Sequence, residues 1–250
     1  MPTDLYAFAV AGLPDVTPGA DLAALIAGAA ARSGRDIARG DVVVVAQKIV
    51  SKAEGALVRL DDVEASPRAR EWAGANGKDP RVVEVVFRES RRIVRMERGI
   101  LIAETHHGFV CANAGVDASN VTPGFVTVLP RDPDTSAERL RSALAEHWQC
   151  QVAVIVSDTF GRPWREGAVN VALGVAGLRP LVDYRGCVDP YGRRLEASVT
   201  ALADELAGAA EIVMRKTAQT PVAIVRGAAE WCGEGSGRQL VREPGLDLFR

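Results

Sequence analysis

Two runs of apolar residues constrain the fold more than any other feature of this sequence. The first is Val42 to Val45, in which every residue is valine, and the second is Val152 to Val156. Uninterrupted runs of this kind are typical of strands buried within a sheet, whereas half-exposed strands alternate apolar and polar residues. The sequence therefore predicts two fully buried strands that come from distant parts of the chain.

Helices and strands are predicted in mixed order along the rest of the chain. Helix starts are indicated at Asp21, at Asp79-Pro80, at the capping-box sequence Thr135 to Glu138, and at Thr200. The helix after Thr200 is expected to bury Leu202, Leu206, Ala209 and Val213. Further strands are predicted at Tyr6–Val10, Ile93–Val94, Ile100–Ile102, Phe109–Ala112, Phe125–Leu129 and Val222–Val225. This order predicts an α+β fold of mixed β-sheets with flanking helices. No break in composition marks a linker, so residues 1–250 are expected to form one domain, or two intimately packed subdomains.

Charge and composition exclude several classes of protein. Lys and Arg total 30 and Asp and Glu total 32, so the formal net charge is −2, and a broad nucleic-acid footprint is not expected. The apolar window Leu22 to Ala31 is shorter than the ~20 residues that cross a bilayer, and Met1 to Val10 lacks the pattern of a secretory signal. The four cysteines are scattered without a metal-binding spacing. We therefore expect a cytoplasmic protein with free thiols and no membrane partner.

The familiar nucleotide-binding and hydrolase motifs are absent. The sequence has no phosphate-binding P-loop, no Rossmann fingerprint after a strand, and no Gly-x-Ser-x-Gly elbow. The segment Gly233 to Gly237 is rich in glycine but follows no clear strand, so a flexible loop is the better interpretation.

The strongest chemical signal follows the second apolar run, in Ser157 to Arg165. Asp158 and Thr159 would emerge together from the end of a buried strand, where a carboxylate and a hydroxyl can hold a hard divalent cation. Arg162 and Arg165 lie close enough in sequence to bind the same anion. The alternative is that the acid and hydroxyl satisfy turn amides while the arginines form surface ion pairs.

Two further segments combine small residues with polar ones. Asp117, Ser119 and Asn120 end a stretch that begins at Cys111, and this stretch indicates a ligand loop or an Asx turn between strands. A metal site shared by Asp117 and Asp158 requires the two to converge in space, which their spacing cannot show.

The polar residues Gln47, Lys48, Ser51 and Lys52 follow the first apolar run, where α/β proteins often bind ligands. Lys52 is a candidate phosphate contact, and a solvated lysine pair on an edge strand is the alternative. His106 and His107 would face opposite sides of a strand and could not easily share one metal, so a substrate contact is the weaker interpretation.

Taken together, these segments resemble the GTP-dependent gamma-glutamyl ligase family that adds L-glutamate to the deazaflavin coenzyme F-420 precursor. The resemblance is carried, in order along most of the chain, by Gly12-Leu13-Pro14, Val42 to Gly55, Glu104 to Asn120, Ser157 to Arg165, Asp183 to Gly186 and Ala203-Asp204-Glu205. It implies an uncommon α+β ligase fold, a homodimer, GTP as co-substrate, and two divalent cations, Mg²⁺ or Mn²⁺, with K⁺ as a further candidate. The tail from Gly237 resembles the segment that precedes a flavin-dependent domain in fused relatives, so this chain is expected to be the stand-alone form, without a flavin.

The resemblance also implies roles for individual residues. Asp117 and Asp158 match metal ligands, and Thr159 matches a ligand to a second ion. The nucleotide contacts that it implies are Leu13, Pro14, Asp15, Val16, Gln47, Lys52, Asn120, Arg215, Lys216, Thr217 and Gln219. The remaining substrate or phosphate candidates are Lys48, His106, Arg162 and Arg165. No catalytic base is identified.

The implied mechanism transfers the γ-phosphate of GTP to the terminal carboxylate of the precursor, after which the glutamate amine attacks the acyl phosphate. Two positions depart from the family pattern: Arg215 stands where glycine is common, and His106 where arginine is frequent. A metal-dependent phosphohydrolase and a non-catalytic nucleotide- or deazaflavin-binding module are the alternatives.

Overall fold

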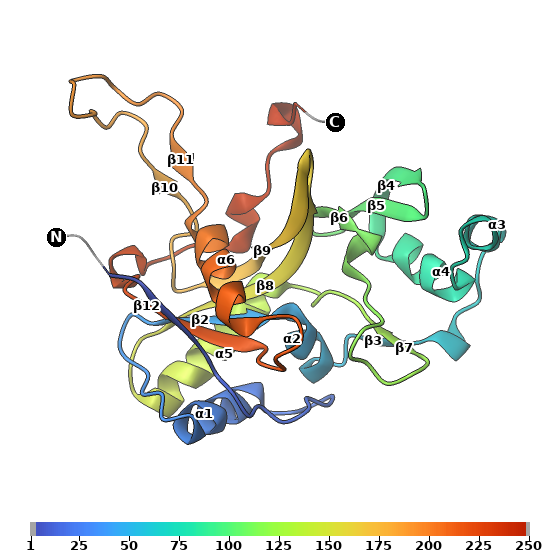
Figure 1. Cartoon of the computed structure of the whole chain (residues 1–250), viewed down its shortest axis with the longest axis horizontal. Helices are drawn as coiled ribbons and strands as arrows, with labels where there is room; N and C mark the ends of the chain where they lie inside the picture. The colour runs from blue at the N-terminus through green and yellow to red at the C-terminus, as the bar shows by residue number, and fades with distance from the viewer. Residues whose placement is uncertain (1–3, 249–250) are drawn as a thin grey trace.

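A five-stranded sheet forms the centre of the protein in a computed structural model that describes residues 4–248 (Figure 1). The strands lie in the order β1 (Tyr6–Ala9), β12 (Val222–Arg226), β2 (Val42–Ala46), β8 (Ala153–Arg162) and β9 (Arg165–Ala176). All neighbours are antiparallel except β2 and β8, which run parallel with Val45 opposite Val156. The two apolar runs are therefore adjacent central strands, and the prediction that both are buried is confirmed.

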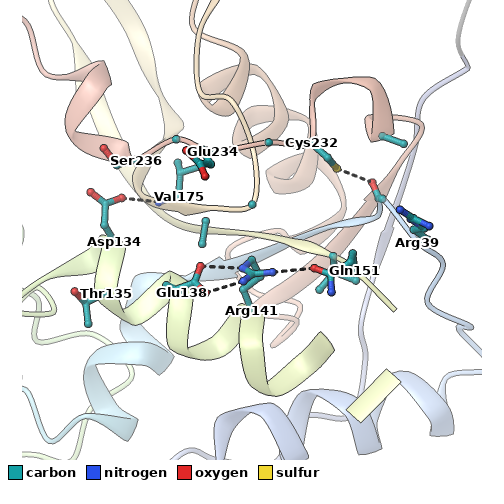
Figure 2. A pocket seen from close by; sticks show the side chains of 17 residues that line it. Arg39, Asp134, Thr135, Glu138, Arg141, Gln151, Val175, Cys232, Glu234 and Ser236 are labelled. Atoms are coloured by element: carbon teal, nitrogen blue, oxygen red, sulfur yellow. Dashed lines mark hydrogen bonds and ion pairs between the residues drawn. The ribbon is translucent and has the colours of Figure 1, made fainter. Parts of the chain in front are cut away.

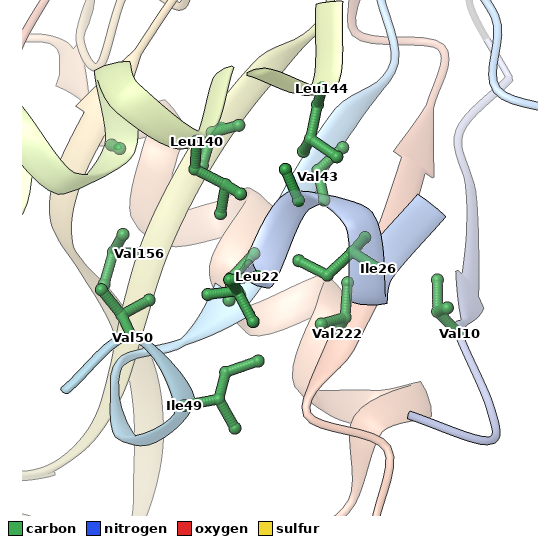
Figure 3. Packing of buried hydrophobic residues seen from close by; sticks show 14 of the residues in the cluster. Val10, Leu22, Ile26, Val43, Ile49, Val50, Leu140, Leu144, Val156 and Val222 are labelled. Carbon is green, nitrogen blue, oxygen red and sulfur yellow. The ribbon is translucent and has the colours of Figure 1, made fainter. Parts of the chain in front are cut away.

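Both faces of this sheet are covered, which explains why the central strands are apolar without alternation. Val43 and Val45 face one hydrophobic cluster, while Val42 and Val44 face another, as expected for a strand with side chains on alternate sides. The first cluster packs beneath α1 (Leu22–Arg32), α2 (Gln47–Ala53) and α5 (Pro133–Trp148), as Figure 3 shows for Ile26, Ile49 and Leu144. The second packs beneath α6 (Leu202–Met214).

A third hydrophobic cluster lies in the middle third of the chain. It is built from α3 (Pro67–Asn76), α4 (Pro80–Arg88), the strands β4 (Ser90–Glu97) and β5 (Ile100–Thr105), and the pair β3 (Leu57–Arg59) and β7 (Phe125–Thr127). Strand β6 (Val110–Ala112) completes a three-stranded sheet with β4 and β5. Short 3-10 helices lie at Leu60–Asp62, Asn113–Gly115, Ala229–Trp231, Gly237–Leu240 and Pro244–Leu246. The strands β10 (Val182–Asp183) and β11 (Val199–Thr200) bound an arm that projects from the body (Figure 1).

The α+β class is confirmed, but two predicted helix starts are wrong. Helix α5 begins at Pro133, because Asp132 accepts a hydrogen bond from the backbone N–H of Thr135 and so acts as the cap. Thr200 pairs in β11, and Ala201 precedes α6 without a side-chain cap.

Two of the inward positions expected in α6 also differ from the structure. Ala209 and Val213 are only partly buried, while the better-buried positions include Ala207, Ala210 and Met214. Within residues 4–248, no helix combines the length and the apolar character needed to cross a bilayer.

Gly174 provides a test of how tightly α5 packs on β9. A Cβ atom at Gly174 would lie 2.0 Å from the carbonyl oxygen of Pro133, whereas one at Gly161 in the same hairpin would meet nothing within 4 Å. We expect Gly174→Ala to lower the free energy of unfolding by about 3 kcal/mol or more, because backbone atoms must shift. Gly161→Ala should leave it within about 1 kcal/mol. Urea denaturation of both variants measures the difference, and equal stabilities would contradict the packing.

Candidate functional site

The polar stretch after the first apolar run forms helix α2, which begins at Gln47 directly after β2. The alternative of lysines on an edge strand is therefore wrong, because β2 is central and the chain turns into a helix as soon as it leaves the sheet. Gln47 is buried, and its Oε1 accepts a hydrogen bond of 2.9 Å from the Ser51 hydroxyl. This contact fixes the first turn of α2 beside the end of the sheet.

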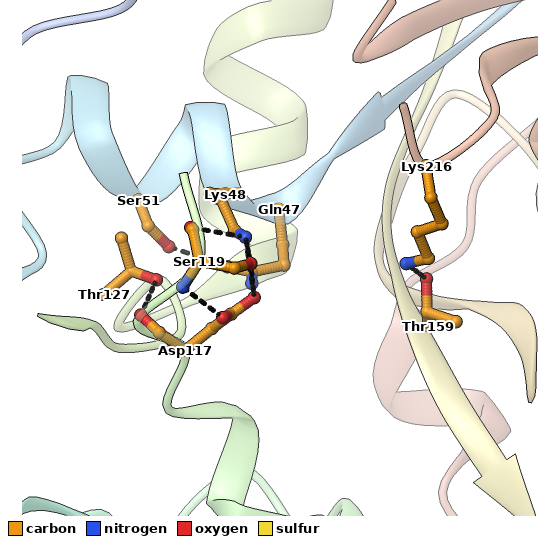
Figure 4. A network of polar contacts seen from close by, with 8 residues as sticks. All are labelled: Gln47, Lys48, Ser51, Asp117, Ser119, Thr127, Thr159 and Lys216. Carbon is orange, nitrogen blue, oxygen red and sulfur yellow. Dashed lines mark hydrogen bonds and ion pairs between the residues drawn. The ribbon is translucent and has the colours of Figure 1, made fainter. Parts of the chain in front are cut away.

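Lys48 joins α2 to the loop that contains Asp117 (Figure 4). Its Nζ lies 2.6 Å from Asp117 Oδ2 and donates to the backbone oxygen and the hydroxyl of Ser119, at 2.9 and 2.7 Å. Asp117 Oδ1 accepts from the Ser119 N–H at 2.7 Å, so the Asx turn is present as well. Burial raises the pKa of Asp117, but the Lys48 ammonium and the Ser119 N–H outweigh it and the net pKa is lowered.

Asp158 lies within β8, opposite Val171 of β9, and not at a strand end as the sequence predicted. The strand continues to Arg162 because β8 and β9 pair as one long hairpin. Desolvation raises the pKa of the half-buried Asp158 carboxyl to about 6, opposed by the charges of Lys216 and Lys48 and reinforced by that of Asp117. The charge of Asp117 acts on Asp158 with a smaller effect than burial, so the two acids share one electrostatic environment.

Thr159 belongs to a hydrogen-bonded group on the other side of the site (Figure 4). Its hydroxyl lies 2.7 Å from Asn170 Oδ1, directly across the hairpin, and receives a hydrogen bond from Lys216 Nζ. Asn170 in turn donates to Glu211 of α6 at 3.1 Å. Asn170 and Glu211 were missed by the sequence interpretation, although a buried asparagine within the otherwise apolar end of β9 is a recognisable signal.

The first predicted nucleotide segment, Leu13 to Val16, is tied to α2. Val16 is buried and Leu13 packs against the cluster beneath α1, which leaves Asp15 exposed. Lys52 Nζ lies 2.9 Å from Asp15 Oδ1, and this hydrogen bond lowers the pKa of Asp15. The ion pair joins two segments that the resemblance assigned to one nucleotide site.

The second predicted nucleotide segment, Arg215 to Gln219, follows α6. Arg215 has φ 56° and ψ 150°, a conformation in which residues other than glycine are strained. The resemblance implied glycine at this position, and glycine adopts a positive φ without strain. Gln219 and Asn120 also have positive φ, at 54° and 53°.

The three remaining substrate candidates, Arg162, Arg165 and His106, come from the β8–β9 hairpin and from the turn after β5. Arg162 and Arg165 flank the tip of the β8–β9 hairpin, where Arg162 donates to the carbonyl of Glu166 and its buried Nε has no hydrogen-bond partner among the described residues. His106 and His107 occupy a turn and not a strand, so the expected opposite orientation does not apply. His106 Nε2 lies 2.9 Å from the carbonyl of Arg88, and His107 Nε2 contacts the carbonyl of Pro130.

A cavity of about 950 Å³ lies elsewhere, at the opposite ends of the central strands (Figure 2). It is lined by the start of α5, by Val152 and Val175, and by the glycine-rich segment Gly233 to Ser236. Arg141 crosses it, bound to Glu138 and Gln151. None of the predicted site residues lines this cavity, so the candidate site is defined by its charged groups and not by the volume of a pocket.

The donor set fits a hard divalent cation that also binds ligand oxygens. In residues 4–248 no three His, Cys, Asp or Glu side chains form a metal-binding group. Asp117 and Asp158 supply two carboxylates. Thr159 is the next residue of β8, so its hydroxyl leaves the opposite face of the strand, and the resemblance assigns it to a second ion. Substrate phosphates would have to complete the coordination of each ion, as is usual for Mg²⁺. Burial raises the pKa of Asp158 despite the opposing charges of Lys216 and Lys48, and a bound cation would favour its ionised form further.

The raised pKa of Asp158 predicts how stability depends on pH. Ionised Asp158 destabilises the folded protein above its folded pKa of about 6, and this effect fades as pH falls toward the unfolded value near 3.9. Asp158→Asn should therefore raise the free energy of unfolding by on the order of 1–2 kcal/mol at about pH 7.5, allowing for partial exposure, and by less at about pH 5. Asp117→Asn should instead destabilise, because it breaks the pair with Lys48. Metal-free urea denaturation tests both, and a pH-independent effect of Asp158→Asn would contradict the assignment.

Comparisons with known proteins show the family to which this chain belongs. The family model described as F420-0:Gamma-glutamyl ligase matches residues 12–227. A "Coenzyme F420:L-glutamate ligase" from Methanothermobacter thermautotrophicus is 48% identical over 244 residues, covering 96% of this chain and 97% of that protein. The protein of the same name from Methanopyrus kandleri is 49% identical over 240 residues, covering 94% and 93%. The chain therefore belongs to the F420-0:gamma-glutamyl ligase family.

Proposed function

We propose that this protein is a GTP-dependent ligase that joins the amine of L-glutamate to the terminal carboxylate of the coenzyme F-420 precursor, and then adds γ-linked glutamate. The observation that carries the proposal is that Lys48 pairs directly with Asp117, and that the charges of Lys216, Asp117 and Lys48 all act on the desolvated Asp158. The chain also aligns along nearly its whole length with proteins named coenzyme F420:L-glutamate ligase. The substrates of this reaction are anions, and the net charge of the protein is −2. Lysines and acids that bind cations, gathered in one place, suit such substrates better than the overall charge does.

The proposed reaction has two steps. The precursor carboxylate attacks the γ-phosphorus of GTP, the bond to the β-phosphate oxygen breaks, and GDP leaves. The glutamate amine then attacks the acyl carbon, phosphate departs, and the amine loses a proton as the amide forms. Lys48, Lys52 and Lys216 would donate hydrogen bonds to phosphate oxygens. Two divalent cations, Mg²⁺ or Mn²⁺, held by Asp117, Asp158 and Thr159, would neutralise the charge on the transferring phosphoryl group, with K⁺ as a further candidate.

The environment of Cys111 argues against a covalent thioester route. Burial, with a smaller contribution from the charge of Asp158, raises the pKa of the Cys111 thiol to about 12. A thiol with that pKa is protonated at neutral pH and is a poor nucleophile. An acyl phosphate needs no protein nucleophile, so the chemistry of the site favours it.

A phosphohydrolase is the second candidate function, because a carboxyl with a pKa of about 6 could act as a base toward water. It would release phosphate from GTP whether or not glutamate and the precursor are present. The ligase reaction requires both, so the two functions differ in a single assay.

Incubation of the protein with GTP, Mg²⁺ or Mn²⁺, L-glutamate and the precursor should yield GDP and a product heavier by one glutamate residue, detected by mass spectrometry. ATP in place of GTP should be a poorer substrate. Asp158→Asn should lose at least about 100-fold in turnover because it removes a charged cation ligand. Asp62→Asn, an exposed acid of the 3-10 helix Leu60–Asp62, is the matched control and should retain full activity.

Phosphate release without a heavier product would instead favour the phosphohydrolase. Binding of GTP without any turnover would favour the non-catalytic nucleotide- or deazaflavin-binding module.

We also propose a homodimer that works in the cytoplasm. The arm between β10 and β11 exposes Tyr184, Val188 and Tyr191, the last with 90% of its surface accessible. An isolated two-stranded hairpin is marginally stable in water, so the arm would gain from packing against a second copy. Light scattering should report twice the chain mass, and Tyr191→Asp together with Val188→Asp should reduce it to a monomer. A wild-type monomer at micromolar concentration would contradict the dimer.

The four free cysteines suit a reducing compartment such as the cytoplasm.

A further inference from the structure

Four side chains form a hydrogen-bonded chain along one side of the site. Lys216 Nζ donates to Thr159 Oγ1, Thr159 Oγ1 lies 2.7 Å from Asn170 Oδ1, and Asn170 Nδ2 lies 3.1 Å from Glu211 Oε2. The chain runs from the loop after α6, through β8 and β9, and back to α6 itself. We name these four residues the relay.

The charges at its two ends fix the direction of every hydrogen bond in the relay. An ammonium group can only donate, so Thr159 Oγ1 must accept from Lys216. A carboxylate can only accept, so the atom of Asn170 that faces Glu211 must be its amide nitrogen, and the amide oxygen must face Thr159. The hydroxyl proton of Thr159 is therefore committed to Asn170.

This direction determines what Thr159 can bind. A hydroxyl has one proton and two lone pairs. With the proton given to Asn170 and one lone pair used by Lys216, the remaining lone pair can accept but the hydroxyl cannot donate. Thr159 can thus act as a ligand to a cation but not as a hydrogen-bond donor to a phosphate, while Lys216 keeps two N–H groups for an anion.

We propose that Asn170 and Glu211 are positioning residues that orient the Thr159 hydroxyl as a cation ligand and hold Lys216 beside it. The inference rests on the proposed metal-dependent function. Asn170 is 4% exposed and its side chain is satisfied at both ends by the relay. Loss of the hydrogen bond from Asn170 to Glu211, or of the one from Thr159 to Asn170, leaves the buried amide free to rotate. The hydroxyl proton of Thr159 is then free to turn toward the cation position. Outer residues that orient metal ligands typically contribute 10- to 100-fold to metal affinity.

The competing explanation is purely structural, because the same bonds tie α6 to the hairpin. A structural role would lower thermal stability without changing the cation affinity of the folded protein. Ser136 offers a control of this kind, since it is buried on α5 and its hydroxyl donates to the carbonyl of Asp132.

The test is calorimetric titration of the full-length protein with MnCl₂, with and without GDP, together with the melting temperature of each variant. Asn170→Ala should weaken Mn²⁺ binding about 10-fold or more, and Glu211→Ala should weaken it by a similar factor. Glu211→Gln keeps an oxygen that accepts from Asn170 and should stay within about 2-fold of wild type. Ser136→Ala should lower the melting temperature while Mn²⁺ affinity is unchanged.

Wild-type affinity in Asn170→Ala, or equal losses in Glu211→Gln and Glu211→Ala, would overturn the inference. A wild-type protein that binds no Mn²⁺ under either condition would overturn the proposed metal-dependent function and the inference with it. The wild-type titration therefore separates the two failures.

Discussion

The parallel pairing of β2 with β8 is the constraint on which the site depends. Parallel strands end at the same edge of a sheet, and the register places Ala46 opposite Ser157. The next residue of one strand is Gln47, which begins α2, and the next residue of the other is Asp158. This pairing brings Lys48 of α2 close enough for its charge to act on Asp158, although the two residues lie far apart in the sequence. Burial of both faces holds this strand in the interior of the protein, with Val43 and Val45 in one cluster and Val42 and Val44 in the other.

The site gathers charge that is only partly balanced. Asp117 is compensated by Lys48 at 2.6 Å, whereas Asp158 is desolvated and its pKa rises to about 6. Lys216 lies on the other side and is linked through Thr159 and Asn170 to Glu211. A protein with a net charge of −2 can therefore hold several anions only where such lysines, and the cations that we propose, are concentrated.

Much of the fold could be predicted from local sequence, because a strand that is buried on both faces is an uninterrupted run of apolar residues. The valine runs indicated the central strands, and the mixed order of elements indicated the α+β class. Helix starts were less predictable. Asp132 and Thr135 both resemble caps, and only the backbone geometry decides between them.

The candidate site could be predicted residue by residue but not as an arrangement. Asp117, Asp158 and Lys216 are contributed by three distant segments, and nothing in their spacing shows that they meet. Asp158 was expected at a strand end, and its place inside β8 follows from the long pairing with β9. The side chains of Asn170 and Glu211 are linked to the site through the Thr159 hydroxyl, so no local motif includes them.

The central claim is that the edge shared by β2 and β8 forms a cation site from two acids of distant origin. The most direct measurement is anomalous X-ray diffraction from crystals soaked in MnCl₂ and GDP. We expect an anomalous peak within about 2.0–2.3 Å of a carboxylate oxygen of Asp158, with Asp117 and Thr159 nearby and Lys48 displaced from Asp117. A peak located elsewhere, or no peak and an intact pair between Lys48 and Asp117, would contradict the claim.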